Sequence, residues 1–455
     1  MNIIIVGCGK IGATLAEQLN NEGHRITVID KNERVLRNIA TKLDVMGISG
    51  NGAVMEVQNE AGVENADVLI AVTGSDEVNM LCCLIAKKQT ELYTIARVRN
   101  PEYEDEVDYL QRMLSINMVI NPEKMAAAEI LRLLELPFAE EIDTFSRGRV
   151  DLIKVRLGSD APILGIPLQD LPRKLSVIPL ICVVERGSEV IIPGGATCLE
   201  AGDMVSFIAT PQEAITFAQE CMIPYEPNRS VFLVGGGRIT YYAAGLLKSR
   251  KSRTQVKIIE IDHDRCLELA GHFNNLTIIN GDGSDQQLMI EEGIEKADAF
   301  VALTGMDEEN IIMSLFAARR GVKRRITKVN RLDPVTVSEE MNVGSVVSTR
   351  MFTSDQVTRF VRGVERTQDV DIEALYTVAN GKAEAAEFLI RENNPAYVGV
   401  PFSELEFRND VLVAAIFRGE EIIRPGGSDH IEVNDRVIVI TTARGLHSIR
   451  DILES

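Results

Sequence analysis

Residues 2–31 of the chain read NIIIVGCGKIGATLAEQLNNEGHRITVIDK, and this stretch decides the fold. Four apolar β-forming residues precede Gly7, and the segment after the turn carries apolar residues at helical spacing. A second apolar run follows and ends on Asp30. The stretch therefore predicts a strand, a glycine-rich turn, a helix and a second strand, which together form a βαβ unit of the kind that binds dinucleotides.

The glycine turn has the spacing Gly7-x-Gly9-x-x-Gly12. The first glycine allows a tight turn, the second lets the backbone approach a pyrophosphate, and the third lets the helix pack closely on the strand. Free N–H groups at the start of the helix would face the phosphates. Asp30 stands where a carboxylate accepts hydrogen bonds from ribose hydroxyls, which favours an NAD-type adenosine. The alternative is a glycine-rich turn in an ordinary α/β protein that binds no ligand.

The overall composition limits the possible partners. A chain of 455 residues is long enough for three or four domains. Its 67 acidic residues against 48 basic ones give a net charge of −19, which argues against nucleic acid or an anionic membrane surface as a partner. No apolar run approaches the roughly 18 residues of a spanning helix, and the chain starts with a strand and not with a signal peptide. We therefore expect a cytoplasmic protein without direct membrane insertion.

The seven cysteines form no CxxC pair, and the five histidines belong to no His/Cys cluster. Reduced thiols and no metal site are the expectation. Cys8 lies inside the glycine turn near a helix N-terminus, where a thiolate is favoured. The other interpretation is that Cys8 is a small residue that fits the turn.

Strands and helices continue to alternate after Asp30, which predicts a parallel, doubly wound sheet. Ligands of such sheets bind beyond the carboxyl ends of the strands. The residues that we expect to form this first site are Gly7, Cys8, Gly9, Lys10, Ile11, Gly12, Asp30, Lys31, Asn51, Gly52, Thr73, Gly74 and Arg97.

A predicted helix from Asn121 to Leu134 ends this first domain, with Asn as its cap and Pro122 in its first turn. From Val150 the sequence changes to short β-rich segments that are followed by a helix from Pro211. This pattern predicts a small α+β module, in which we find no nucleophile, carboxylate pair or ligand cluster.

The chain then repeats itself. Gly7 corresponds to Gly235, 228 positions later, and residues 71–80 return as residues 302–311, 231 positions later, with six of ten identical. The small module returns as well, because residues 193–195 (PGG) correspond to residues 425–427 (PGG), 232 positions later. The sequence therefore predicts a tandem duplication with domains at 1–136, 137–222, 228–365 and 366–455.

The second glycine turn differs from the first. Thr240 replaces Gly12, and Glu260 replaces Asp30, with Asp262 close enough to compete for the same role. The second site is thus either a nucleotide site of altered preference or a vestige. Its candidate residues are Gly235, Gly236, Gly237, Arg238, Ile239, Glu260, Asp282, Gly283, Thr304 and Lys328.

These features together resemble the TrkA family, the cytosolic regulatory subunits of bacterial Trk potassium uptake systems, which are built from RCK (KTN) domains. The resemblance rests on the glycine turn and its acid, on the segments AVTGSDEVN from residue 71 and ARVRNPEY from residue 96, and on the β-rich module. All but the ARVRNPEY segment have recognisable counterparts in the second half, and the tandem arrangement covers nearly the whole chain.

The resemblance implies a homotetrameric ring of RCK units beneath a membrane potassium channel-like subunit of the TrkH type. It implies NAD(H), and also ADP or ATP, as regulatory ligands, and it implies that the protein is not an enzyme. It assigns the dinucleotide to Gly7, Gly9, Gly12 and Asp30 in the first copy, and to the corresponding residues in the second.

The competing function is that of an NAD-dependent oxidoreductase. Such an enzyme needs a general acid or base near the nicotinamide. The five histidines have no shared sequence context between the two halves. The sequence does not say which nucleotide activates and which inhibits.

Overall fold

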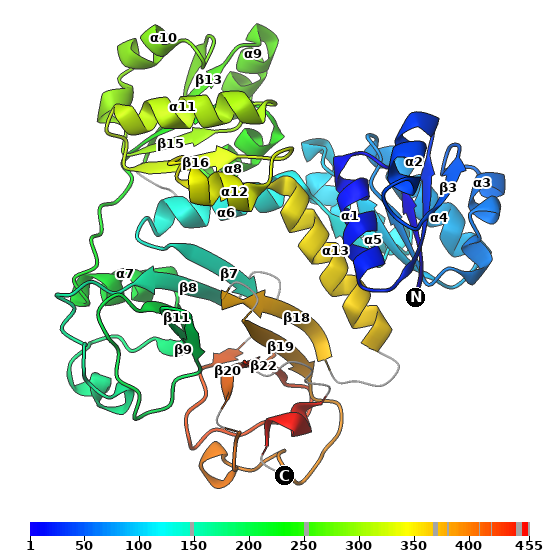
Figure 1. Ribbon diagram of the computed structural model, residues 1–455. Coiled ribbons are helices and arrows are strands. Elements are labelled where there is room, and N and C mark those ends of the chain that lie inside the picture. Colours follow the sequence, from blue (N-terminus) through cyan, green and yellow to red (C-terminus); the bar gives the residue numbers. More distant parts are fainter. Residues whose placement is uncertain are drawn as a thin grey trace. The chain divides into compact units, whose positions relative to one another are not determined.

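The computed structural model describes residues 1–145, 150–249, 254–366, 372–379, 382–408, 410–419, 421–442 and 448–453. Contacts divide the chain into two compact units, and each unit combines segments from both halves of the sequence. The first unit consists of Met1–Leu134 and Asn228–Thr358, and the second of Glu135–Pro227 and Arg359–Ser455. Figure 1 follows the chain from blue to red.

A six-stranded sheet of order β3-β2-β1-β4-β5-β6 forms the first domain, and its strands are parallel. The central strand is apolar on both faces because helices cover it, as expected for a parallel sheet; its residues Ile3 to Val6 are all buried. The strands are β1 (Asn2–Val6), β2 (Arg25–Asp30), β3 (Met46–Ser49), β4 (Val68–Ala71), β5 (Tyr93–Arg97) and β6 (Met118–Ile120).

Helices connect these strands. In α1 the buried residues Leu15, Ala16 and Leu19 lie at helical spacing, as the sequence predicts. Ser75 caps α4, because its side chain accepts a hydrogen bond from the Val78 N–H at 3.2 Å. The helices are α1 (Lys10–Asn21), α2 (Glu33–Ala40), α3 (Met55–Glu60), α4 (Asp76–Gln89), α5 (Val107–Met113) and α6 (Pro122–Glu135).

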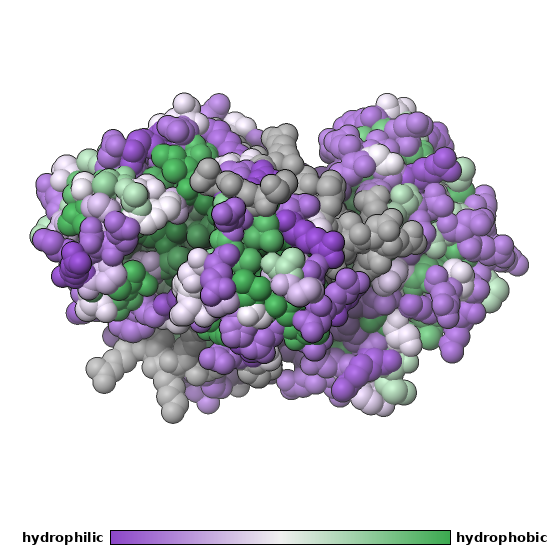
Figure 2. All heavy atoms as spheres, turned by 90° about the horizontal axis from the view of Figure 1, so that it is seen from below, coloured by the Kyte–Doolittle hydropathy of each residue, from purple (hydrophilic) through white to green (hydrophobic). Residues whose placement is uncertain are grey.

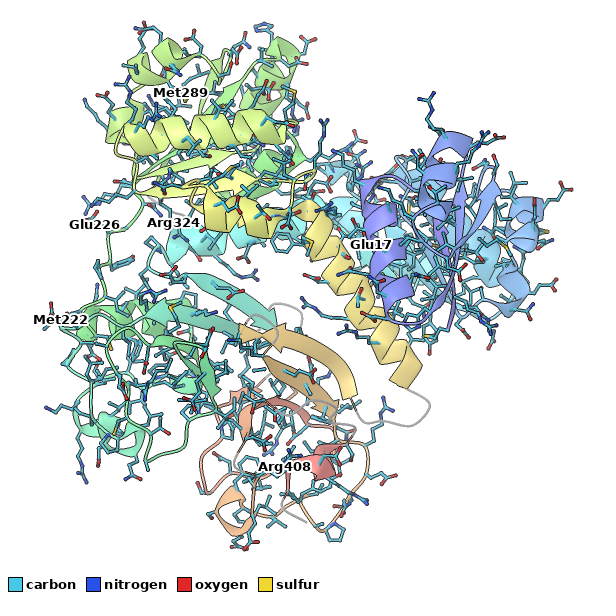
Figure 3. All side chains as sticks on the ribbon, in the orientation of Figure 1. Glu17, Met222, Glu226, Met289, Arg324 and Arg408 are labelled. Atoms are coloured by element: carbon cyan, nitrogen blue, oxygen red, sulfur yellow. The ribbon has the colours of Figure 1, made fainter. Side chains whose placement is uncertain are left out.

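The second Rossmann-type domain repeats this order as β14-β13-β12-β15-β16-β17. Its core packs Phe232, Met289 and Phe300, and Met289 lies inside the domain in Figure 3. The strands are β12 (Ser230–Val234), β13 (Gln255–Glu260), β14 (Thr277–Asn280), β15 (Ala299–Ala302), β16 (Arg324–Lys328) and β17 (Ser345–Val347). The helices are α8 (Arg238–Ser249), α9 (His263–His272), α10 (Gln286–Glu291), α11 (Asp307–Arg319), α12 (Pro334–Glu340) and α13 (Thr349–Arg366).

The second unit contains two antiparallel five-stranded sheets, of order β10-β9-β11-β8-β7 and β18-β19-β22-β20-β21. The first is built from β7 (Glu141–Phe145), β8 (Val150–Arg156), β9 (Leu180–Arg186), β10 (Glu189–Ile191) and β11 (Met204–Ile208), with α7 (Pro211–Glu220). The second is built from β18 (Ile372–Val378), β19 (Ala383–Leu389), β20 (Val411–Arg418), β21 (Glu421–Ile423) and β22 (Arg436–Thr441).

The two small modules share one apolar core, in which Phe145 meets the ring of Tyr376 edge to face at 4.7 Å between centroids. An ion pair also joins them, because the two terminal guanidinium nitrogens of Arg424 contact the two carboxylate oxygens of Glu213. On the face of the molecule shown in Figure 2, hydrophilic residues dominate and apolar residues form smaller patches between them.

The predicted fold class is confirmed: a Rossmann-like parallel sheet followed by a small module occurs twice. The sequence pattern did not predict α5, β6 or β7. The counterpart of α6 in the second copy is α13, which spans Thr349–Arg366. None of the described helices is long and apolar enough to cross a membrane.

Candidate functional site

The first glycine turn has the geometry that its spacing predicts. Gly7 has φ +97°, and a Cβ there would lie 2.8 Å from the Thr73 nitrogen. A Cβ on Gly12 would lie 1.9 Å from the Gly7 carbonyl oxygen, so helix α1 can sit this close to the turn only with glycine at that position. A Cβ on Gly9 would meet no atom within 4 Å. The open space therefore lies above the glycine that was expected to face a pyrophosphate.

Asp30, the last residue of β2, fixes the backbone around this turn. Its Oδ2 accepts a hydrogen bond from the Cys8 N–H at 2.6 Å, and its Oδ1 accepts one from the Asn32 N–H at 2.8 Å. An ionised carboxylate has about four acceptor positions. Asp30 can therefore hold the turn and still accept hydrogen bonds from a ribose.

Asn79 organises the side of the site formed by β4 and β5. This fully buried amide accepts hydrogen bonds from the N–H and the hydroxyl of Thr73, both at 2.7 Å, and donates to the Arg97 carbonyl at 2.8 Å. Asn310 makes the same contacts with Thr304 and Lys328 in the second copy. Sequence reasoning gave Asn79 no role, although its identity with Asn310 in the repeat was the available signal.

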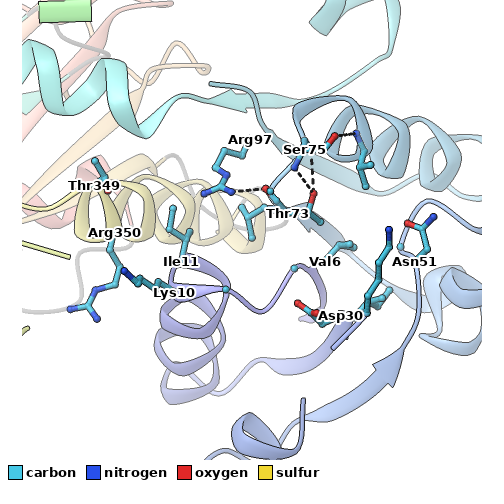
Figure 4. A pocket seen from close by; sticks show the side chains of 18 of the residues that line it. Val6, Lys10, Ile11, Asp30, Asn51, Thr73, Ser75, Arg97, Thr349 and Arg350 are labelled. Carbon is cyan, nitrogen blue, oxygen red and sulfur yellow. Dashed lines mark hydrogen bonds between the residues drawn. The ribbon is translucent and has the colours of Figure 1, made fainter. Parts of the chain in front are cut away.

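Arg97 is a fixed cation at the end of β5. Its guanidinium donates to the Thr73 carbonyl at 2.5 Å, as drawn in Figure 4, and its Nε is buried with no hydrogen-bond partner among the described residues. Burial, with a smaller effect from Arg99, lowers the pKa of Arg97 to about 10. The side chain therefore remains positively charged at neutral pH.

These residues surround a cavity of about 590 Å³ (Figure 4). Cys8 and Gly12 do not line it: Cys8 is buried, and Gly12 packs beneath the turn. Sequence reasoning missed Glu123 and three residues of the second Rossmann domain, Asn330, Thr349 and Arg350. The predicted residues that do line the cavity are Gly7, Gly9, Lys10, Ile11, Asp30, Lys31, Asn51, Gly52, Thr73, Gly74 and Arg97.

Cys8 has only 3% of its surface exposed. Burial, together with the charge of Asp30, raises the pKa of its thiol to about 12. The thiol is therefore protonated at neutral pH, which favours the interpretation of Cys8 as a small residue that fits the turn.

The second glycine turn is built on a different contact. Gly235 has φ +100°, like Gly7, and a Cβ on Gly237 would meet no atom within 4 Å. The hydroxyl of the fully buried Thr240 donates to the Gly235 carbonyl, so a hydrogen bond replaces the close approach that Gly12 allows in the first copy. The carboxylate of Glu260 accepts from the Gly236 N–H, as Asp30 does from Cys8.

The remaining candidate residues of the second copy are placed as follows. Arg238 and Ile239 begin α8, and a Cβ on Gly283 would lie 2.1 Å from a methyl of Val234. The Asp282 carboxylate accepts from the Ser284 N–H at 2.8 Å, which lowers its pKa. Lys328 donates to the Leu303 carbonyl at 3.0 Å. A contact that the sequence did not predict joins Arg265 Nε to the Gly236 carbonyl at 2.6 Å.

Two Rossmann-type units with nucleotide-type glycine turns, each followed by an antiparallel module, define a tandem RCK protein. The TrkA-N domain family matches residues 3–122 and 231–349, and the TrkA-C domain family matches residues 152–221 and 385–454. The chain belongs to the TrkA family, the potassium uptake proteins of Trk systems. The resemblance found in the sequence is thereby confirmed.

The curated relatives match the chain over nearly its full length. The Trk system potassium uptake protein TrkA homolog of Archaeoglobus fulgidus is 34% identical, over 99% of this chain and 100% of its own. The TrkA protein of Halomonas elongata is 32% identical, over 99% and 98%. Among solved structures, the GsuK channel has a TM-score of 0.63 at 18% identity and covers 97% of this chain and 77% of its own, which shows the shared fold.

Proposed function

We propose that this chain is the nucleotide-sensing regulatory subunit of a potassium uptake system. It binds NAD(H), and also ADP or ATP, and it gates a membrane potassium transporter of the TrkH type by changing conformation. The observation that carries the proposal is the cavity above Gly9, which joins the glycine turn, Asp30 and Arg97 to residues of the second Rossmann domain.

The cavity offers separate groups for each part of a nucleotide. Asp30 would accept hydrogen bonds from the adenosine ribose. The N–H groups at the start of α1 and the space above Gly9 would hold the pyrophosphate. Arg97 and Thr73 would face the part of the ligand beyond the pyrophosphate. A solved structure of similar fold is the GsuK channel bound to NAD, at 19% identity and a TM-score of 0.61, over 97% of this chain and 77% of its own.

Gating requires that the ligand bind two conformations with different affinity. Glu123, in the first turn of α6, and Thr349, the first residue of α13, both line the cavity. These two helices are also the segments through which the chain passes from the first unit into the second. A nucleotide would therefore act on the beginnings of both connecting helices.

The proposal includes the assembly and the domains predicted from the sequence. We propose a homotetramer at the cytoplasmic face of the membrane, held there by the partner, with domains at 1–136, 137–222, 228–365 and 366–455. We also propose that the chain transfers no hydride. Of the side chains that most often serve a dehydrogenase as general acid or base, the described lining of the cavity contains no histidine or tyrosine, but it does contain Lys10 and Lys31.

Nucleotide binding by the purified full-length chain tests the site. We expect NADH, ADP and ATP to raise the melting temperature and to bind with measurable heat. Asp30→Ala should remove the NADH response that belongs to the first site, and Glu260→Ala should leave it in place. Glu33→Ala is the matched control, because it removes a carboxylate that is 65% exposed on the next helix. A wild-type chain that ignores all adenine nucleotides would refute the proposal.

Potassium flux tests the regulatory role. The chain is reconstituted with its membrane partner in vesicles, and the flux of potassium into the vesicles is measured with and without each nucleotide. We expect flux to change with nucleotide in the wild type and to lose its NADH dependence in Asp30→Ala. Flux that is indifferent to every nucleotide would contradict gating, and oxidation of NADH with a hydroxy or amino acid would support an oxidoreductase instead.

A further inference from the structure

The second Rossmann domain contributes a cation to the first cavity. Arg350 lies in the first turn of α13 and lines the cavity together with Thr349, its neighbour, and Asn330, which follows β16. Figure 4 shows Thr349 and Arg350 on this helix, on the side of the cavity where Lys10 and Ile11 begin α1. The Nε of Arg350 is buried and has no hydrogen-bond partner in the part of the chain that the structure describes.

The duplication shows which residue of the first copy corresponds to Arg350. β6 and α6 of the first copy correspond to β17 and α13 of the second, 227 positions later, so Arg350 occupies the place of Glu123. An acidic residue in one copy is thus a basic residue in the other. Glu123 also influences a residue of the second copy. Burial lowers the pKa of Lys328, the negative charge of Glu123 raises it, and the positive charge of Lys10 lowers it.

The charges that line the first cavity favour a polyanion. Among its described lining residues, Lys10, Lys31, Arg97 and Arg350 are basic, whereas Asp30 and Glu123 are acidic. Asp30 is engaged with the turn, and Glu123 Oε1 lies 3.8 Å from the side chain of Arg99. The chain as a whole carries a net charge of −19, so this local excess of cations is opposite to its general character.

We infer that Arg350 binds the terminal phosphate of an adenosine triphosphate whose ribose is held by Asp30. This inference rests on the proposed nucleotide site and names the chemistry of its far end. Arginine binds phosphate through two parallel N–H bonds, and the buried Nε of Arg350 is one donor that has no partner among the described residues. A dinucleotide shares its two phosphates with ADP and places a nicotinamide riboside where ATP has its third phosphate, so Arg350 distinguishes ATP from both ADP and NADH.

Binding of ATP, ADP and NADH to the full-length chain, measured by calorimetry, tests the inference. We expect Arg350→Ala to weaken ATP binding by about tenfold or more, ADP by less, and NADH by less than about threefold. Arg350→Lys should restore part of the ATP affinity, because it keeps the charge and loses the paired geometry. Arg37→Ala is the control, since it removes an arginine that is 78% exposed on α2.

The outcomes separate this inference from the proposed function. If Asp30→Ala loses NADH while Arg350→Ala still binds ATP like the wild type, the nucleotide site stands and the role of Arg350 is refuted. An equal loss of all three ligands in Arg350→Ala also refutes it, because the arginine then supports only the packing of the domains. A wild-type chain that binds no adenine nucleotide refutes both proposals.

Discussion

Gly9 and Gly12 lie three residues apart in the same turn, yet alanine should affect them in opposite ways. Gly9 has φ −64°, which any residue adopts, and its Cβ would meet nothing within 4 Å. Gly9→Ala should therefore change the free energy of unfolding by less than about 1 kcal/mol. The added methyl group would fill the space for the pyrophosphate, and we expect nucleotide affinity to fall at least about tenfold, or roughly 1.4 kcal/mol.

Gly12→Ala should act on stability instead. Its Cβ would lie 1.9 Å from the Gly7 carbonyl oxygen, where real Cβ contacts are not shorter than 3.0 Å. Either α1 or the turn must move by about 1 Å, and overpacking of this kind costs about 1–3 kcal/mol. The melting temperature should therefore fall by several degrees.

Thermal and urea unfolding, together with calorimetric titration of NADH, measure both effects in the full-length chain. The expected pattern is a stable Gly9→Ala that binds poorly and a less stable Gly12→Ala. The reasoning is wrong if Gly9→Ala binds NADH as tightly as the wild type, or if Gly12→Ala melts at the wild-type temperature.

Three further predictions concern other parts of the molecule. The hydrogen bond and charge of Arg424 lower the pKa of Glu213 to about 2. The Glu213–Arg424 pair therefore stabilises the folded chain at pH values above about 4.5, the pKa of Glu213 in the unfolded chain, and this stabilisation is lost as the pH falls toward 2. Glu213→Gln should cost at most about 1 kcal/mol at pH 7 because the pair is partly exposed, and urea unfolding from pH 7 to pH 3 should show this difference shrinking. Tyr242→Phe removes a hydroxyl that hydrogen-bonds twice to the first Rossmann domain, so it should destabilise the first unit by about 1–2 kcal/mol; unchanged hydrogen exchange at the start of α6 would contradict this. Alkylation at pH 7.5 followed by mass spectrometry should label the partly exposed Cys198 before the buried Cys8, and early labelling of Cys8 would show that its thiol is accessible.

The parts of the fold set by local sequence could be predicted. The glycine spacing and the acid at the end of β2 specify backbone geometry within some thirty residues, so the roles of Gly7 and Gly12 in the turn follow from chain conformation alone. The duplication was visible because residues at fixed offsets are identical. Nucleotide binding by these residues stays a prediction.

Contacts between distant segments could not be predicted. Asn330 and Arg350 reach the first cavity only because the two Rossmann domains pack together, and each is separated from Gly9 by more than three hundred positions. The burial of Cys8 likewise depends on the packing around it, and this burial decides between the two interpretations that the sequence left open for its thiol. Local patterns contain no information on either point.

The exchange of Glu123 for Arg350 also bears on why both copies share one polypeptide. In a complex of two identical chains, any substitution at this position would occur in both copies at once, and the two glycine-turn sites would remain identical. When both copies lie in one polypeptide, each position can be substituted independently, so one glycine-turn site can change while the other stays the same. A duplicated pair within one chain can thereby carry two sites of different charge, whereas two identical chains would carry the same site twice.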